Sequence, residues 1–375
     1  MARALSGGAG SGQAAKAVDD WLAGTWAPRR ILRTDSGTSA LRLAIEAAIA
    51  VTGEPRVAAP AYVCYDVATA LDGARATPIL YDLDPLTLGP DPESLRRAFD
   101  RGARSVIVAH LYGVPLDMES IGRLARDHGA LIIEDAAQAI GAVCSGRPAG
   151  ALGDLGVLSF GRGKGVTGGG GGALLVFEKR VDAAVPATLP ASASTVRNRL
   201  ALLAQGVLAR PGLYWIPASL PGTGLGETVY HAPWAATRQS DFSTGVLAVT
   251  MALAETEARI RAAHAETFQG WLAGHPRIAA ITPPGNGLAS WLRFPVLAEG
   301  VGDSPYSAGA GKLGVMPGYP LSLADLPGFR ERVENAADRF PGARRLAARL
   351  GTLPSHGLLA HSDLAALKRW LEGLR

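Results

Sequence analysis

The chain has 375 residues, of which 48% are hydrophobic and 19% are charged, and its net charge is +4. This length suits about two domains. The basic residues are spread among acidic ones, so we expect no nucleic-acid-binding tail. The two cysteines, Cys64 and Cys144, and the seven dispersed histidines lack metal-ligand spacing, so we expect neither a disulfide framework nor a metal site.

The N-terminal residues resemble neither a secretory signal nor a membrane anchor. Residues 1–19 are rich in Gly, Ser and Ala, and we expect them to form a flexible segment. Nowhere does an apolar run reach the roughly 18 to 20 residues of a transmembrane helix. We therefore expect a cytoplasmic protein.

The first clear helix signal follows the sequence Asp-Ser-Gly-Thr at residues 35–38. An apolar-periodic segment begins there and ends near Gly53, so Ser36, Gly37 and Thr38 stand at a helix N-terminus. The exposed N–H groups and the positive end of the helix dipole favour an anion, typically phosphate, at such a point. An ordinary serine N-cap explains the same residues and remains an alternative.

From residue 56 onward, short apolar strands alternate with helical segments. This βαβ pattern predicts an α/β fold with a mostly parallel sheet that is covered on both faces. Ligands bind such sheets beyond the carboxyl ends of the strands. Polar or aromatic residues stand at four of these ends, which carry Tyr62, His110, Asp135 and Ser159.

We expect a large domain over residues 20–245 and a small C-terminal α/β domain over 246–375, which includes a bridging helix. The large domain carries an atypical insertion at about 181–233, with an amphipathic helix and aromatic residues. An active-site lid or an oligomer contact is the favoured interpretation of this insertion. Contact of residues 195–216 with a membrane surface is a weaker alternative.

A glycine-rich stretch at residues 159–172 contains one lysine, Lys164. A phosphate-binding P-loop does not fit, because Leu158 and Gly165 stand where that motif needs glycine and Ser or Thr. A primary amine between two buried strands instead suggests covalent chemistry. Asp135 follows another strand and could face the same pocket, and Gln138 comes three residues later. A lysine, a carboxylate and a phosphate-binding helix N-terminus together suit pyridoxal phosphate.

From about residue 21 to its C-terminus, the chain resembles the DegT/DnrJ/EryC1/StrS family of sugar aminotransferases, which are fold-type I pyridoxal-phosphate enzymes. The resemblance is carried, in order, by DSGTSALRLAIEA, VAAPAYV, PILYDLDPLTL, AHLYGVPLDM, IIEDAAQAIGA, GALGDLGVLSF, the lysine followed by VTGGGGGALLVF, and NAADRFPGARRLAARLGTLPSH.

The resemblance implies a homodimer with shared active sites. It also implies transfer of an amino group, usually from glutamate, to a keto group on a nucleotide-linked sugar, in polysaccharide or amino-sugar biosynthesis. By position, Lys164 resembles the lysine that bonds the cofactor and Asp135 the partner of its ring nitrogen. Gln138 would lie near the ring hydroxyl, while Gly37, Thr38 and Ser159 would hold the phosphate.

Several positions depart from the family pattern. The usual histidine of the lysine loop is Gly161, a usual glutamate is Gly170, and an asparagine that reaches the partner's phosphate is Ala236. Cys64 stands where the family has the aromatic that stacks on the cofactor, so Tyr62 or Tyr65 is expected to replace it. These departures leave two alternatives open: a catalytically degenerate protein that binds a sugar nucleotide or a protein, and an enzyme with another acceptor.

Overall fold

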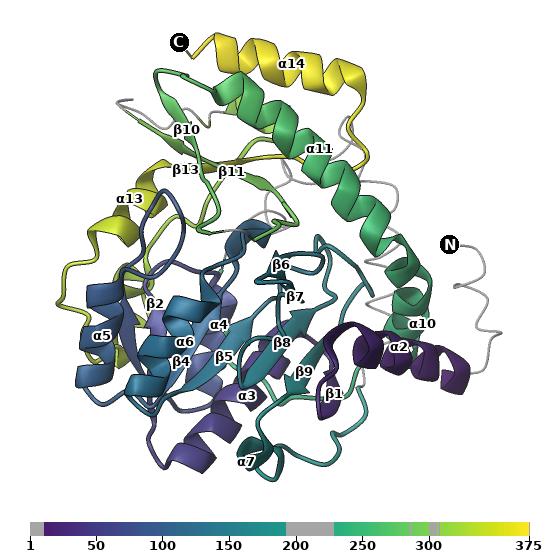
Figure 1. Ribbon diagram of the computed structural model, residues 1–375, viewed down its shortest axis with the longest axis vertical. Coiled ribbons are helices and arrows are strands. Elements are labelled where there is room, and N and C mark those ends of the chain that lie inside the picture. The colour runs from purple at the N-terminus through teal and green to yellow at the C-terminus, as the bar shows by residue number, and fades with distance from the viewer. Residues whose placement is uncertain (1–10, 193–228, 286, 300–305, 307, 375) are drawn as a thin grey trace.

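The computed structural model describes residues 11–192, 229–285, 287–299, 306 and 308–374. Within them, a large seven-stranded sheet and a smaller four-stranded sheet are joined by the long helix α11 (Ala254–Leu272). Figure 1 shows the large sheet with its helices in the lower part and the small sheet with α14 (His361–Glu372) in the upper part. The predicted α/β class is confirmed.

The large sheet is mostly parallel. Only β9 runs antiparallel to its neighbours β1 and β8. The strands, in their spatial order, are β1 (Arg30–Thr34), β9 (Gly172–Val176), β8 (Leu155–Ser159), β5 (Leu131–Asp135), β4 (Ser105–Ala109), β2 (Arg56–Pro60) and β3 (Thr77–Tyr81). The carboxyl ends of β2, β4, β5 and β8 therefore lie next to one another.

Helices cover both faces of this sheet. Successive side chains of a strand point to opposite faces, so each buried strand contributes to two hydrophobic clusters. In β4, Ile107 packs in one hydrophobic cluster, and Val106 and Val108 pack in the other. The first cluster includes α3 (Gly37–Thr52) and α4 (Tyr65–Gly73). The second includes α2 (Ser11–Trp26), α5 (Pro92–Asp100), α6 (Met118–Asp127) and α10 (Asp241–Thr250).

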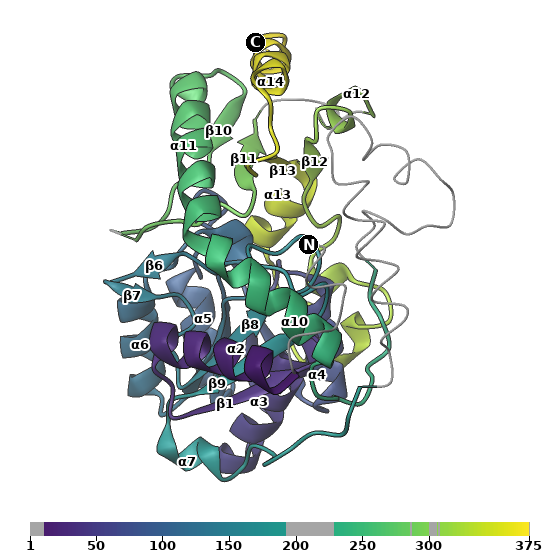
Figure 2. The same cartoon turned by 90° about the vertical axis from the view of Figure 1, so that its right-hand side faces the viewer.

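The prediction of a flexible segment over residues 1–19 is wrong for its second half. Residues 11–19 belong to α2, which lies alongside α10 (Figure 2). Val18, Leu22 and Trp26 recur every four residues and are buried, so the helix has an apolar stripe that the sheet covers. The Trp26 indole N–H also donates to the carbonyl oxygen of Ala149 at 2.8 Å. Residues 1–10 lie outside the described part.

The small sheet is antiparallel throughout, in the order β10 (Ile278–Ala280), β11 (Phe294–Ala298), β13 (Leu350–Leu353) and β12 (Met316–Pro317). The remaining elements are short, apart from the nine-residue α13. They are the hairpin β6 (Val143–Cys144) and β7 (Arg147–Pro148), the helices α7 (Lys179–Asp182), α12 (Ala308–Gly311) and α13 (Pro341–Arg349), and the 3-10 turns η1 (Leu111–Gly113), η2 (Met251–Leu253), η3 (Leu323–Asp325) and η4 (Arg330–Arg332).

The segment between β12 and β13 crosses back from the small sheet to β3, the edge strand of the large sheet. There the side-chain amide of Asn335 bonds both the N–H and the carbonyl oxygen of Leu80, at 2.8 and 2.9 Å. Asp82 accepts the N–H groups of Gly342 and Ala343, where α13 begins. The two sheets therefore share contacts well beyond α11, and one hydrophobic cluster contains residues of both.

The domain boundary that we expected near residue 245 falls inside α10. The amphipathic helix of the predicted insertion, with the segment 195–216, lies outside the described residues. In the part that the structure describes, no helix is both long and apolar enough to cross a bilayer.

Candidate active site

An open cleft lies at the carboxyl ends of β2, β4, β5 and β8. Six of the seven predicted site residues line it, namely Gly37, Thr38, Asp135, Gln138, Ser159 and Lys164. The other lining residues come from α3, from β4 and from the segments that follow β2, β4 and β5, and they are Leu41, Val63, Cys64, Asp66, Val67, Ala109, His110, Leu111 and Ala137.

One end of the cleft is the N-terminus of α3. The Ser36 hydroxyl accepts the N–H of Ser39 at 3.1 Å, so Ser36 is the N-cap that the sequence offered as an alternative. Gly37 and Thr38 follow the cap and line the cleft together with Ser159. A Cβ atom at Gly37 would lie 2.7 Å from Cβ of Ser159, so glycine is needed for this close approach. The cap and the anion site are therefore compatible, because they use different residues.

Lys164 belongs to the loop between β8 and β9, and its half-buried side chain reaches the same cleft. The glycines that follow it pack closely against other elements. A Cβ atom at Gly172 would lie 2.6 Å from the carbonyl oxygen of Ser36, and one at Gly171 would collide with the side chain of Gln239. The glycine run thus lets β9 pack against the start of α3 and against Gln239, which is a packing function.

Asp135 ends β5 and faces the cleft beside Lys164. Burial raises the pKa of Asp135 above its ordinary value, although the N–H of Ala137 and the charge of Lys164 oppose this shift. The Ala137 N–H donates to Asp135 Oδ1 at 3.0 Å. The neighbours of Asp135 therefore offset the cost of burying its charge only in part. A cationic group in the cleft would stabilise the charged carboxylate further.

Beneath Asp135 lies a fully buried pair, Glu134 and His110. His110 Nε2 is 2.8 Å from Glu134 Oε1, and the same carboxylate accepts three N–H groups, from Gly150, Leu152 and Gly153. Burial opposes ionisation of Glu134, but His110 and the backbone donors more than offset it, so the pKa of Glu134 lies below its ordinary value.

Cys144 lies close enough to His110 and Glu134 for the three to resemble a metal-ligand set. However, the carboxylate already accepts four hydrogen bonds, and His110 Nδ1 accepts the N–H of Leu116 at 3.2 Å. We therefore interpret the group as a hydrogen-bonded support for the end of β5.

Gln138 lines the cleft next to Asp135 and is held from two sides. Its Oε1 accepts the N–H of Tyr112 at 2.8 Å, and its Nε2 donates to the hydroxyl of Tyr319 at 2.8 Å. Tyr319 comes from the segment between β12 and β13, 181 residues further along the chain.

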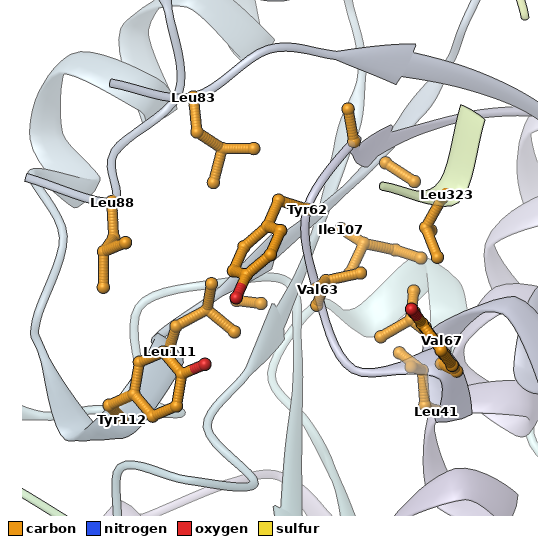
Figure 3. Packing of buried hydrophobic residues seen from close by; sticks show 14 of the residues in the cluster. Leu41, Tyr62, Val63, Val67, Leu83, Leu88, Ile107, Leu111, Tyr112 and Leu323 are labelled. Carbon is orange, nitrogen blue, oxygen red and sulfur yellow. The ribbon is translucent and has the colours of Figure 1, made fainter. Parts of the chain in front are cut away.

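Tyr62, which we expected at the cofactor, lies outside the cleft. Its side chain packs among buried hydrophobic residues (Figure 3), and it is absent from the cleft lining. Its hydroxyl accepts the N–H of Tyr319 at 2.8 Å, and the two rings lie 5.4 Å apart, so the side chain is directed into the core. Tyr65 is likewise buried, with its hydroxyl on Leu321. Cys64 lines the cleft instead, and burial raises the pKa of its thiol to about 12.

Sequence reasoning missed Asp66 as a lining residue, and it missed the support that Glu134 gives to His110. The signal for Glu134 is a charged residue inside the apolar strand LIIED, which must find partners when buried. Asp66 carries no such signal, because an acidic residue in the first turn of a helix is common.

Residues 6–369 match the sequence pattern of the DegT/DnrJ/EryC1/StrS aminotransferase family. Among curated proteins, the L-glutamine:2-deoxy-scyllo-inosose aminotransferase of Streptoalloteichus tenebrarius is 39% identical over 140 residues, which are 37% of this chain and 33% of that protein. The GDP-perosamine synthase of Caulobacter vibrioides is 35% identical over 144 residues, 38% of each chain. The matched segment thus spans about a third of each of these relatives.

The fold is also shared with solved structures. The PLP form of a protein assigned as a sugar aminotransferase from Streptococcus pneumoniae superposes with a TM-score of 0.71 at 17% sequence identity, covering 94% of this chain and 88% of that one. At this identity the likeness concerns the fold alone.

Proposed function

Because the chain belongs to the DegT/DnrJ/EryC1/StrS aminotransferase family, we propose that it is a pyridoxal-phosphate-dependent aminotransferase. It would move an amino group from an amino acid, with glutamate as first candidate, to a keto group of a nucleotide-linked sugar. The observation that carries this proposal is the convergence of Lys164, Asp135 and the N-terminus of α3 on one cleft.

The residues of the cleft fit the cofactor in charge and in donor chemistry. The N-terminus of α3, with Thr38 and Ser159, offers donors and a favourable dipole to a phosphate, and Gly37 leaves no side chain in the way. Asp135, whose pKa burial raises, is a partner for a protonated ring nitrogen. When bound, pyridoxal phosphate supplies the electron-withdrawing ring that amino-group transfer needs.

Each of the residues at the cleft would then have a separate role in the reaction. Lys164 Nζ would hold the cofactor covalently in the resting enzyme and would carry protons between donor and acceptor atoms once released. Asp135 would keep a proton on the ring nitrogen. Gln138 would hydrogen-bond near the ring hydroxyl, and Glu134 with His110 would keep the end of β5 in place.

An acceptor outside nucleotide sugars is a second candidate. It is favoured by the name of the Streptoalloteichus tenebrarius relative, which refers to an inosose as acceptor and to L-glutamine as donor. A degenerate, non-catalytic protein is less favoured, because Lys164 and Asp135 lie in the same cleft.

The test begins with spectroscopy. Purified protein mixed with pyridoxal phosphate should gain a visible absorption band, and borohydride should fix the cofactor onto Lys164, as peptide mass spectrometry would show. Glutamate and glutamine should each be tried as the amino donor that bleaches the band. Keto sugars linked to nucleotides and free inososes should then be compared as acceptors. A protein that binds no cofactor contradicts the proposal.

We further propose a cytoplasmic homodimer. Exposed apolar side chains occur from residue 229 to 253, at Val229, Trp234, Val249 and Leu253, and would be covered by a second copy. Light scattering during size-exclusion chromatography should give twice the chain mass of 38.7 kDa. A monomer at micromolar concentration contradicts this part alone.

A further inference from the structure

The orientation of the Gln138 amide is fixed by its neighbours. A backbone N–H can only donate, so the Gln138 atom that faces Tyr112 N–H must be the amide oxygen. The amide nitrogen must then face the hydroxyl of Tyr319. A side-chain amide has two N–H groups, and one of them remains for the cleft that Gln138 lines.

Tyr319 is itself held firmly in place. Its N–H donates to the Tyr62 hydroxyl at 2.8 Å, and its ring stacks at 20° on that of Tyr112, with 6.1 Å between ring centroids. Two residues later, the Leu321 N–H donates to the Tyr65 hydroxyl at 2.9 Å. Two tyrosines that follow β2 therefore anchor the backbone of residues 319–321, and the Tyr319 hydroxyl is delivered to Gln138.

Tyr112, on the other side of the amide, has an unusual backbone conformation. Its φ angle is +57°, in the left-handed region that residues with a side chain rarely adopt. Such angles persist when the surroundings hold them, and they often occur at functional sites. Here the conformation accompanies an N–H group that points at Gln138 Oε1.

We propose that Tyr319 is a positioning residue that turns the Gln138 amide so that an N–H group faces the ring hydroxyl of the cofactor. This inference rests on the proposed function for the identity of the ligand. It also links the segment between β12 and β13 to the cofactor, since any movement of residues 319–321 would reach Gln138. Without the Tyr319 hydroxyl, the amide would keep only the Tyr112 contact and could swing away.

The test compares Tyr319→Phe with Tyr230→Phe. Each variant keeps its ring and loses one hydroxyl, but the Tyr319 hydroxyl contacts Gln138, whereas the Tyr230 hydroxyl contacts Asp72. In the cofactor-loaded protein, Tyr319→Phe should move the pH midpoint of the visible band by roughly half to one unit, which corresponds to one hydrogen bond. Gln138→Ala should move it in the same direction, and the double variant should not add to this shift. Tyr230→Phe should leave the midpoint in place.

A second measurement needs no cofactor. The Tyr112 amide is held by Gln138, so its hydrogen exchange should be roughly 5- to 30-fold faster in Tyr319→Phe, the ratio expected from one lost contact. Exchange at Tyr112 that is unchanged, or equally fast in Tyr230→Phe, overturns the inference. A wild-type protein that binds no cofactor contradicts the proposed function instead, while the exchange experiment still tests whether Tyr319 orients Gln138.

Discussion

The two ends of the cleft are held by different kinds of contact. At the end formed by Gly37, Thr38 and Ser159, here called the phosphate end, glycines bring one backbone against another, as Gly172 does with Ser36. At the end around Asp135 and Gln138, here called the ring end, side chains from distant parts of the chain hold one another. Added atoms should therefore damage the phosphate end, while removed donors or acceptors should damage the ring end.

The largest expected effect lies between the two ends. Lys164→Ala should lower kcat/KM by at least about 10²- to 10⁴-fold, the usual contribution of positioned proton transfer alone. The fold should remain, because the lysine is half-buried in an open cleft. Steady-state kinetics and thermal unfolding measure the two effects. Lys179→Ala, an exposed site on α7, is the control. Similar activity in both variants contradicts the role of Lys164.

The next effect tests the ring end by removal. Glu134→Ala leaves His110 and three backbone N–H groups without their acceptor, and should lower the free energy of unfolding by about 3–5 kcal/mol. Urea unfolding at pH 7 measures this loss. Glu119→Ala, which removes an exposed carboxylate from α6, should change stability by less than about 1 kcal/mol. Equal losses of stability in the two variants would mean that the buried hydrogen bonds of Glu134 stabilise the fold no more than an exposed carboxylate does.

The same carboxylate gives a pH dependence with a definite sign. Its pKa is lowered by folding, so its stabilisation is present above the unfolded value near 4.5 and is lost as the pH falls through the lower, folded value. The wild type should therefore lose stability below about pH 4.5. Glu134→Gln, which cannot titrate, should show a shallower loss over that range in urea unfolding at several pH values. Parallel curves would assign the acid sensitivity to other groups.

A smaller effect tests the phosphate end by addition. The new methyl of Gly37→Ala would lie 2.7 Å from Cβ of Ser159, so the start of α3 must shift at a cost of about 1–3 kcal/mol. The apparent Kd for pyridoxal phosphate should rise as the phosphate donors move. Gly245→Ala, inside α10 with open space around it, should instead stabilise the protein by about 0.5–1 kcal/mol. Cofactor titration that does not distinguish the two variants contradicts the close packing at Gly37.

The smallest effect concerns the lysine loop, where Gly161 stands in place of the usual family histidine. A Cβ atom there would meet Ser159 Oγ at 3.5 Å and Lys164 Cγ at 3.9 Å, which are ordinary contacts. Gly161→Ala should stabilise the protein by about 0.4–1 kcal/mol, mainly by restricting the unfolded chain. Gly163→Ala should destabilise it, because Gly163 has a φ angle of +74°. Differential scanning calorimetry would show melting temperatures that move in opposite directions.

That Gly37, Thr38, Ser159 and Lys164 line one cleft could be predicted from sequence, because their signals are local. A turn before an apolar-periodic helix predicted the start of α3, and Asp135 and Ser159 stand where apolar strands end. The carboxyl ends of neighbouring parallel strands then bring these residues together without further information.

The ring end could not be predicted in the same way. The contact of Gln138 with Tyr319 joins residues 181 positions apart, and an irregular Gly/Pro segment gives no period from which to place Tyr319. The sequence favours Tyr62 or Tyr65 at the cofactor because Cys64 stands where the family has its stacking aromatic, but the Tyr62 hydroxyl is bonded to the N–H of Tyr319 in the core. Residues 11–19 were misread because their small-residue composition concealed the four-residue spacing of Val18, Leu22 and Trp26.

The bond between Asn335 and the edge strand β3 has a consequence for biosynthesis. Leu80 is synthesised 255 residues before Asn335, whose side chain bonds its N–H and carbonyl groups. Asp82 is likewise synthesised 260 residues before its partner Gly342 at the start of α13. While the ribosome is still making the C-terminal third, β3 is thus an open sheet edge, which other chains can join. Nascent chains that stall before residue 335 should therefore depend on chaperones more than chains released at full length.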